Sequence, residues 1–191
     1  MIHEIKGEGK AGERTLTEKE ELARLLWRCG ALRLTEGDPP LVWEPEAALA
    51  DGEAREALLD ALEAMVRDHY ASAQALLGGP WAELLAGRLK LPLDPPETPE
   101  RPLAVTDAVA RGSELYALTA PIRGTGASIA AAAIFNFGFP SARRKLDRAD
   151  VRLHWLTDLE TAAAVALQEG RVDFETYDLL LAMQEMELPG D

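Results

Sequence analysis

The sequence has 191 residues and a mass of 20.8 kDa, which favours one domain large enough to bury a sizeable core. Its 33 acidic and 20 basic residues give a formal net charge of −13, so the chain lacks the basic surface that nucleic-acid and anionic-membrane binders require. We therefore expect neither a nucleic acid nor a membrane as a partner. With 47% hydrophobic and 28% charged residues, the composition is typical of a soluble globular protein.

The N-terminal segment is polar and mixed in charge, so it resembles neither a signal peptide nor a membrane anchor. We expect a cytoplasmic protein in which residues 1–15 form a flexible lead-in and residues 16–191 form a single domain. The single cysteine, Cys29, excludes an intramolecular disulfide. No Cys/His cluster has the spacing of zinc ligands, so the sequence predicts no metal site.

The first half of the chain predicts helices around a short β-hairpin. Thr17 and Glu20 have capping-box spacing, which indicates a helix that begins there and ends at Gly30. Residues 31–43 (ALRLTEGDPPLVW) predict two short strands joined by a turn. Residues 51–70 then predict a long helix that an aspartate caps.

From residue 71 onward, short apolar runs alternate with helical patterns. The run at 129–137 (IAAAAIFNF) has no polar face, which is typical of a strand buried on both sides. The alternation predicts an α/β fold with a central, mainly parallel sheet of about five strands and helices on both faces. We expect strands at 73–77, 91–93, 103–105, 129–137 and 151–156, a turn at 107–113, and helices at 81–89, 114–122, 143–148, 157–167 and 173–186.

The order and spacing of several segments resemble those of the orotate phosphoribosyltransferases, over roughly residues 20–165. The resemblance implies a type I phosphoribosyltransferase-like fold, in which residues 31–43 belong to a small N-terminal hood over the C-terminal strand ends. Because the resembled enzymes act as homodimers, it also implies a homodimer. The matching segments are 22–34 (LARLLWRCGALRL), 78–93 (GGPWAELLAGRLKLPL), 103–113 (LAVTDAVARGS) and 141–159 (SARRKLDRADVRLHWLTDL).

The segment 103–113 lies where this family carries its ribose-phosphate signature. In the family, paired aspartates contact the ribose and a Thr/Gly loop holds the phosphate. The resemblance places Thr106 and Asp107 at the paired-acid positions and Arg111, Gly112 and Ser113 in the phosphate loop. It therefore implies a phosphorylated ribose or nucleotide as the ligand, with these five residues as its candidate binding site.

Two further loops are candidate phosphate-binding loops. Gly78 and Gly79 precede a helix, where they form either a second anion-binding loop or a tight structural turn. The segment 123–128 (RGTGAS) offers another register for the phosphate loop, because its backbone N–H groups could face a phosphate. That register leaves no strand before Val151, whereas the register at 107–113 is followed by a helix and a strand, so we prefer the latter.

Several positions depart from the family's pattern. Thr106 replaces one of the paired acids, and Asp38 stands where the family has a turn lysine. The segment 94–102 (DPPETPERP) is a short, acidic substitute for the catalytic loop, and Asn136-Phe137 replaces an Asp-Arg pair whose Arg helps to hold orotate. Close like charges repel by about 1 kcal/mol per pair even in water, so these changes oppose the binding of pyrophosphate.

These departures favour a divergent, non-catalytic orotate phosphoribosyltransferase-like protein, a pseudoenzyme of pyrimidine metabolism that binds a nucleotide or sugar phosphate. One alternative is an active phosphoribosyltransferase that releases pyrophosphate from phosphoribosyl pyrophosphate with magnesium as cofactor. Another is a structural or regulatory subunit of an active paralogue. We assign no catalytic residue, and structural interpretations remain open in which Asp107 caps the next turn, His154 is a packed histidine and Cys29 is a core residue.

Overall fold

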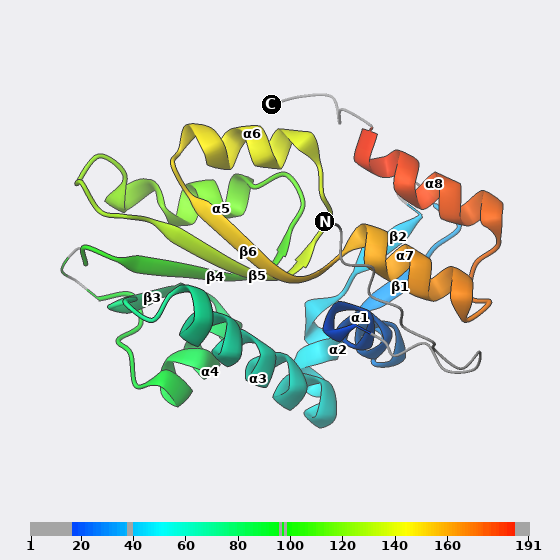
Figure 1. The fold of residues 1–191 in the computed structure, drawn as a ribbon, viewed down its shortest axis with the longest axis horizontal. Helices are drawn as coiled ribbons and strands as arrows, with labels where there is room; N and C mark the ends of the chain where they lie inside the picture. Colours follow the sequence, from blue (N-terminus) through cyan, green and yellow to red (C-terminus); the bar gives the residue numbers. More distant parts are fainter. Residues whose placement is uncertain (1–16, 38–39, 96, 98, 186–191) are drawn as a thin grey trace, which may run out of the picture.

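The computed structural model describes residues 17–37, 40–95, 97 and 99–185 (Figure 1). The predicted lead-in at 1–15 and the position of Asp38 lie outside the described residues. The elements are α1 (Glu18–Arg28), β1 (Leu32–Leu34), β2 (Leu41–Trp43), α2 (Pro45–Ala50), α3 (Gly52–His69), β3 (Ala75–Gly78), α4 (Pro80–Leu89), β4 (Pro102–Val109), α5 (Ser113–Leu118), the 3-10 turn η1 (Ala120–Ile122), β5 (Ala130–Asn136), α6 (Pro140–Arg148), β6 (Arg152–Asp158), α7 (Leu159–Gln168) and α8 (Phe174–Glu185).

The predicted α/β fold is confirmed, with a parallel sheet in the order β3-β4-β5-β6. The described residues form four strands in this sheet, so the expectation of about five was too high by one. Leu93, in the segment expected to begin another strand, makes only an isolated bridge with Leu76. Pro92 and Pro95 on either side of it have no N–H, so a longer ladder cannot form there.

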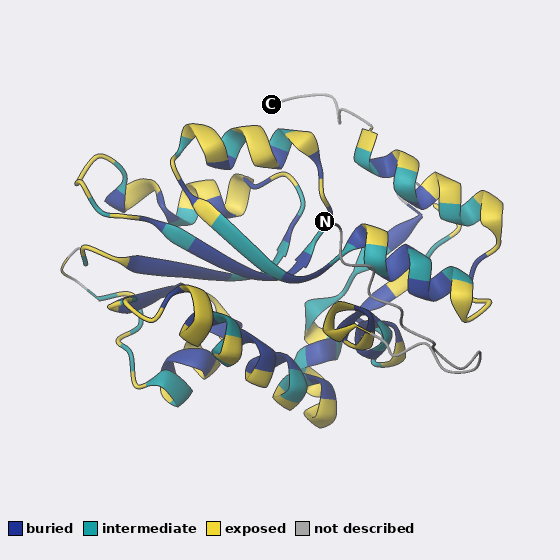
Figure 2. Cartoon of the chain, viewed as in Figure 1, coloured by how far each residue is buried: buried dark blue, intermediate teal, exposed yellow. Residues whose placement is uncertain are grey.

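Both faces of the sheet are covered by helices, with α3 and α4 on one side and α5 and α6 on the other (Figure 1). Successive residues of β5 face opposite sides, because side chains alternate along a strand. Ala131 and Ala133 pack toward α5 and α6, whereas Ala132 and Ile134 pack toward α3 and α4. Figure 2 shows β3, β4 and β5 as mostly buried, the first half of β6 as exposed or intermediate, and the helices with a buried side and an exposed side. The predicted strand buried on both sides is therefore confirmed.

The predicted hood is present at the carboxyl ends of the strands. β1 and β2 pair antiparallel, with Leu32 opposite Trp43. The Trp43 ring stacks on Phe135 of β5, with 5.4 Å between ring centroids, which fixes the hood on the sheet. The hood continues into α2, a short helix that begins at Pro45 and that the sequence analysis did not predict.

β4 is longer than expected, which changes the local structure around the candidate site. Its pairing with β5 continues to Val109 opposite Asn136, so Asp107, which was expected to begin a turn, lies within the strand together with Thr106. The connecting loop is reduced to residues 110–112. The following helix is also shorter than the expected 114–122, because Pro121 limits the last residues to a 3-10 turn.

A third group of helices, α1, α7 and α8, packs together beside the hood (Figure 1). The predicted capping box is confirmed: Glu20 N–H donates to the Thr17 hydroxyl, and Thr17 N–H donates to the Glu20 carboxylate. The Trp27 indole N–H donates to the carbonyl of Ala162 at 2.9 Å, which joins α1 to α7 inside the core.

None of the helices in the described part of the chain is long and apolar enough to cross a membrane.

Candidate functional site

Two adjoining cavities open at the carboxyl ends of β3 and β4, where ligands bind in open parallel sheets. The first, of about 400 Å³, lies between α2, the β3–α4 loop and β4. The second, of about 630 Å³, lies between the hood, the β4–α5 loop and the end of β5. Both cavities are lined by Pro45, Asp107, Glu114 and Leu115.

Asp107 forms part of the wall between the two cavities. Its Oδ1 accepts a hydrogen bond from the N–H of Ala108 at 2.6 Å and a longer one from the Thr106 hydroxyl at 3.4 Å. These bonds fix the carboxylate on its own strand. The alternative interpretation, in which Asp107 caps the next turn, is wrong. Asp107 lies within β4, and the next helix, α5, begins at Ser113 without a side-chain cap.

The β4–α5 loop is held tightly against α6. Gly112 has φ +70°, and a Cβ there would lie 3.3 Å from the Cα of Ala142. Lys145 Nζ donates to the Ser113 hydroxyl at 2.8 Å, a contact from α6 that the sequence did not suggest. The loop therefore has a fixed conformation that presents exposed Arg111 beside the second cavity.

The β3–α4 loop contributes Gly78 and Gly79 to the first cavity. Gly78 has φ +135°, and a Cβ there would lie 2.3 Å from the carbonyl oxygen of Val105. Close packing between β3 and β4 therefore requires glycine at this position, whatever the loop binds. Gly79 is the N-cap of α4, where a Cβ would meet nothing within 4 Å.

The alternative phosphate loop at 123–128 lies elsewhere. It directly precedes β5, so it is at the amino edge of the sheet, opposite the edge that carries Asp107. Its neighbours there are Glu100 and Arg101, which line a surface depression with Thr125 and Ser128. The structure thus brings the register at 107–113 together with Gly78, Gly79 and the hood, and separates residues 123–128 from them.

Known proteins resemble the chain in both sequence and structure, although no profile of a known protein family matches it. The orotate phosphoribosyltransferase of Bacillus caldolyticus is 23% identical over 202 residues, covering 90% of this chain and 97% of the relative. That of Bacillus subtilis is 21% identical over 156 residues, covering 70% and 72%.

Solved structures extend the resemblance to the fold. Orotate phosphoribosyltransferase from Aeropyrum pernix superposes with a TM-score of 0.65 at 24% identity, covering 78% of this chain and 99% of that one. The Mycobacterium tuberculosis orotate phosphoribosyltransferase in complex with 5-phospho-alpha-D-ribosyl 1-diphosphate gives 0.60 at 15%, covering 76% and 99%. The chain has the type I phosphoribosyltransferase fold. The predicted resemblance to the orotate phosphoribosyltransferases is confirmed, at the low sequence identity that fits a divergent chain.

Among the charged side chains that line the two cavities of this phosphoribosyltransferase-like chain, acids outnumber bases. Glu46, Asp107 and Glu114 line the first cavity, and two of them also line the second. Among the described residues that line either cavity, Arg111 is the only Lys or Arg. Because close like charges repel, the first cavity disfavours a polyanion, and the second offers one guanidinium to a phosphate.

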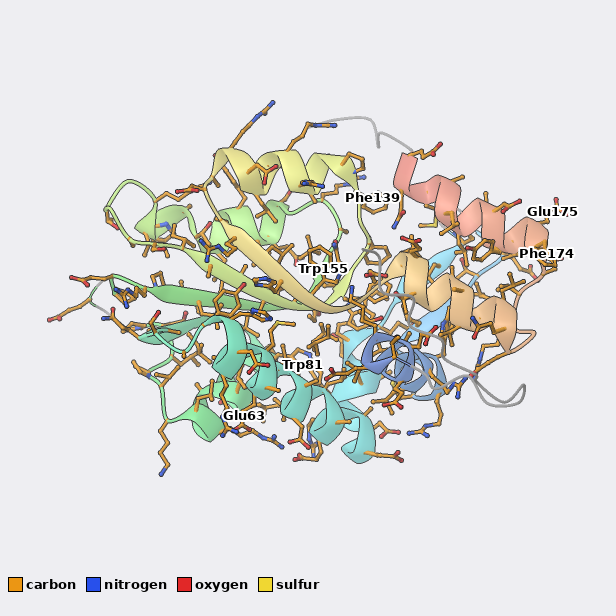
Figure 3. The ribbon with its side chains drawn as sticks, viewed as in Figure 1. Glu63, Trp81, Phe139, Trp155, Phe174 and Glu175 are labelled. Atoms are coloured by element: carbon orange, nitrogen blue, oxygen red, sulfur yellow. The ribbon has the colours of Figure 1, made fainter. Side chains whose placement is uncertain are left out.

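Sequence reasoning missed two tryptophans at the site. Trp81, at the start of α4, is buried and lines the first cavity, and Figure 3 labels it on the α3 and α4 side of the sheet. Trp43 lines the second cavity. The indole nitrogens of both are buried without a hydrogen-bond partner among the described residues, so two donors are free beside the cavities. Two signals for these positions were available in the sequence. Pro80 begins a helix directly before Trp81, and the helix-forming run EPEAALA follows Trp43.

The site can be compared with what magnesium requires, since the resemblance implied that ion for an active enzyme. Magnesium binds proteins through one or two carboxylates together with the phosphates of a substrate. The described residues contain no group of three or more His, Cys, Asp or Glu side chains placed to hold a metal. Asp107, which lines both cavities, would supply one carboxylate to a magnesium ion that arrives with a phosphorylated ligand.

Proposed function

We propose that the chain is a non-catalytic, orotate phosphoribosyltransferase-like protein that binds a phosphorylated ribose in the second cavity. The observation that carries the proposal is the charge of the two cavities, which combine three acids with one arginine, Arg111. One guanidinium and a fixed loop suit a single phosphate group. They do not suit a ligand that carries a diphosphate as well.

Phosphoribosyl transfer requires the site to stabilise a leaving pyrophosphate while the ribose becomes cationic. The first cavity faces such a group with Glu46, Asp107 and Glu114. At the end of β5, the position of the family's orotate-binding arginine holds Phe137, which is buried and packs between the rings of Phe135 and Phe139. Both features support loss of catalysis.

Binding of ribose phosphate draws on the residues that remain. Arg111 and the Ser113 hydroxyl lie at the β4–α5 loop as partners for the phosphate, and Asp107 lies at the cavity wall as an acceptor for ribose hydroxyls. The hydrogen bond from Ala108 N–H holds that carboxylate in place. Such preorganised polar groups favour binding because little side-chain freedom is lost.

The proposal is tested by titrating ribose 5-phosphate and following the melting temperature or the heat of binding. We expect saturable stabilisation of the wild type, a loss of affinity of about tenfold or more in Arg111→Gln, and no binding in Asp107→Ala. Arg148→Gln removes the same charge from an exposed position that lines neither cavity, and it should bind like the wild type. Absence of any shift with millimolar ribose 5-phosphate would contradict the proposal.

A second candidate function is an active phosphoribosyltransferase with an altered substrate. The open cavities and the retained Asp107 support it, as does the indole N–H of Trp81, which is buried beside the first cavity without a hydrogen-bond partner among the described residues. In that case magnesium would enter with the diphosphate substrate, with Asp107 as its carboxylate. Release of pyrophosphate from phosphoribosyl pyrophosphate in the presence of candidate bases decides between the two.

We also propose that the chain forms a homodimer, as the resembled enzymes do. Light scattering coupled to gel filtration should then give twice the 20.8 kDa mass of the chain. A monomeric mass at micromolar concentration would contradict this proposal. The cytoplasmic location stays a prediction from the sequence.

A further inference from the structure

A third cavity, of about 220 Å³, lies at the opposite edge of the sheet, where β4, β5 and β6 begin. It is smaller than the 300–1,000 Å³ typical of sites for drug-sized ligands, so its size fits a small ion or molecule. Its walls come from the end of α3 and from the residues that lead into the three strands. The lining residues are His69, Tyr70, Ser72, Ala73, Arg101, Pro102, Leu103, Ser128, Ile129, Ala130, Asp150 and Arg152.

The strand register gathers basic side chains around this cavity. Leu103, Ala130 and Arg152 are neighbours across β4, β5 and β6, so their side chains share the face that α3 covers. His154 lies two residues beyond Arg152 on the same face, and its ring stacks on His69 with 4.3 Å between centroids. Arg101 joins them from the residue just before β4.

Neither arginine of this cavity is neutralised by a carboxylate among the described residues, whereas Arg28, Arg33 and Arg88 all form ion pairs. The acids nearby are Asp150, which lines the cavity, and Glu100, which precedes Arg101. Neither acid is within ion-pair distance of the two guanidiniums. In a chain with net charge −13, two guanidiniums that form no ion pair with any described residue make this small cavity a local positive centre.

The groups around the cavity are also held in position. The backbone of Arg101 is fixed by Gln74, whose N–H donates to the Arg101 carbonyl at 3.0 Å and whose side-chain oxygen accepts from the Arg101 N–H at 3.3 Å. The Tyr70 hydroxyl donates to the Ala131 carbonyl at 3.0 Å and lies 2.5 Å from Nδ1 of His154. Burial, and then the nearby positive charges of His69 and Arg152, lower the pKa of His154, which agrees with a positive centre here.

We propose that this cavity binds a phosphate-sized oxyanion between Arg101 and Arg152. Guanidinium groups match the geometry of phosphate oxygens, and the hydroxyls of Ser72 and Ser128 and the ring of His69 supply further donors at the rim. The site lies at the other end of the strands from Asp107 and Arg111. It is therefore independent of the ribose phosphate site proposed above. The oxyanion is either free inorganic phosphate or the phosphoryl group of a larger ligand.

The histidines give a direct readout, because the chain has only three of them, one of which, His69, lines this cavity while His154 stacks on it. The experiment is a titration with inorganic phosphate at pH 7.5 and constant ionic strength, followed by the Hε1 resonances in proton NMR. His69→Gln and His154→Gln assign the signals. We expect saturable shifts of the His69 and His154 resonances in the wild type, and a loss of phosphate affinity of about tenfold or more in Arg101→Gln/Arg152→Gln.

Arg148→Gln is the matched control, since it removes a positive charge from an exposed part of α6 outside the cavity. It should keep the wild-type affinity. Each arginine is exposed, so the single variants Arg101→Gln and Arg152→Gln are expected to fold and should each weaken binding. Equal saturation by ribose 5-phosphate and phosphate would identify the phosphoryl group as the ligand, and saturation by phosphate alone would identify the free ion.

The proposal would be overturned by phosphate shifts that do not saturate, that sodium chloride reproduces at the same ionic strength, or that persist in the double arginine variant. Failure of ribose 5-phosphate to protect the Asp107 site would leave the histidine titration unaffected. The two proposed sites are therefore tested independently of each other.

Discussion

Gly78 and Gly79 are adjacent in the chain but have different surroundings. A Cβ at Gly78 would collide with the Val105 carbonyl of β4, whereas a Cβ at Gly79 would meet nothing within 4 Å. The sequence showed only a Gly-Gly-Pro turn that suited either an anion loop or a structural turn. The structure shows that one glycine is required by packing, and that only Gly79 is free to serve another role.

This contrast leads to a prediction at the residue scale. Gly78→Ala should lower the free energy of unfolding by more than about 2 kcal/mol, because it combines a strained φ with a backbone collision. Gly79→Ala, at φ −85°, is the matched control and should cost less than about 1 kcal/mol. Urea unfolding of both variants measures the difference. Equal stabilities would show that the close contact between β3 and β4 does not exist in solution.

Among the elements, those with strong local signals could be predicted from the sequence. The capping box of α1 and the two-faced apolar run of β5 are examples. The length of β4 could not be predicted, since the residues from Asp107 onward have the local pattern of a turn and only pairing with β5 extends the strand to Val109. α2 was missed because a helix of only six residues, beginning at Pro45, carries too little periodicity. Its Glu46 was missed with it, although it helps to set the charge of the site.

Asp158 joins two elements and supplies a prediction at that scale. It caps α7 through Thr161 N–H, and its Oδ2 accepts from Lys19 of α1 at 2.8 Å and from the Trp155 indole at 3.0 Å. Burial alone would raise its pKa, but these hydrogen bonds outweigh burial and lower the pKa to about 2. The charged form is thus stabilised in the folded state, by about 2 to 3 kcal/mol relative to a pKa near 3.9 in the unfolded chain.

Because the folded pKa is the lower one, this stabilisation is fully present above about pH 4 and is lost as the pH falls toward 2. Asp158→Asn should therefore be less stable than the wild type at pH 7, and the gap should shrink below pH 4. Urea unfolding at several pH values measures it. Asp173→Asn, which changes the exposed cap of α8, is the control and should cost less. A gap that is constant from pH 7 to pH 3 would contradict this account.

Across the whole molecule, charge is distributed unevenly between the two edges of the sheet. The sequence predicted the net charge of −13 and, from it, that the chain does not bind nucleic acid. The distribution of this charge could not be predicted, because residues such as Arg101 and Arg152 are 51 positions apart in the chain. Only the strand register brings them to the same cavity. Acids gather at the carboxyl edge, and two arginines that form no ion pair with any described residue gather at the amino edge.

The acidic carboxyl edge underlies the central claim that the chain lacks phosphoribosyl transfer activity. The most direct test incubates the protein with phosphoribosyl pyrophosphate, orotate and magnesium and measures the release of pyrophosphate, with an active orotate phosphoribosyltransferase run in parallel. We predict turnover below about 0.01 per second, a thousandfold under the median of about 10 per second for enzymes. Release at a rate comparable to that of the parallel enzyme would contradict the claim.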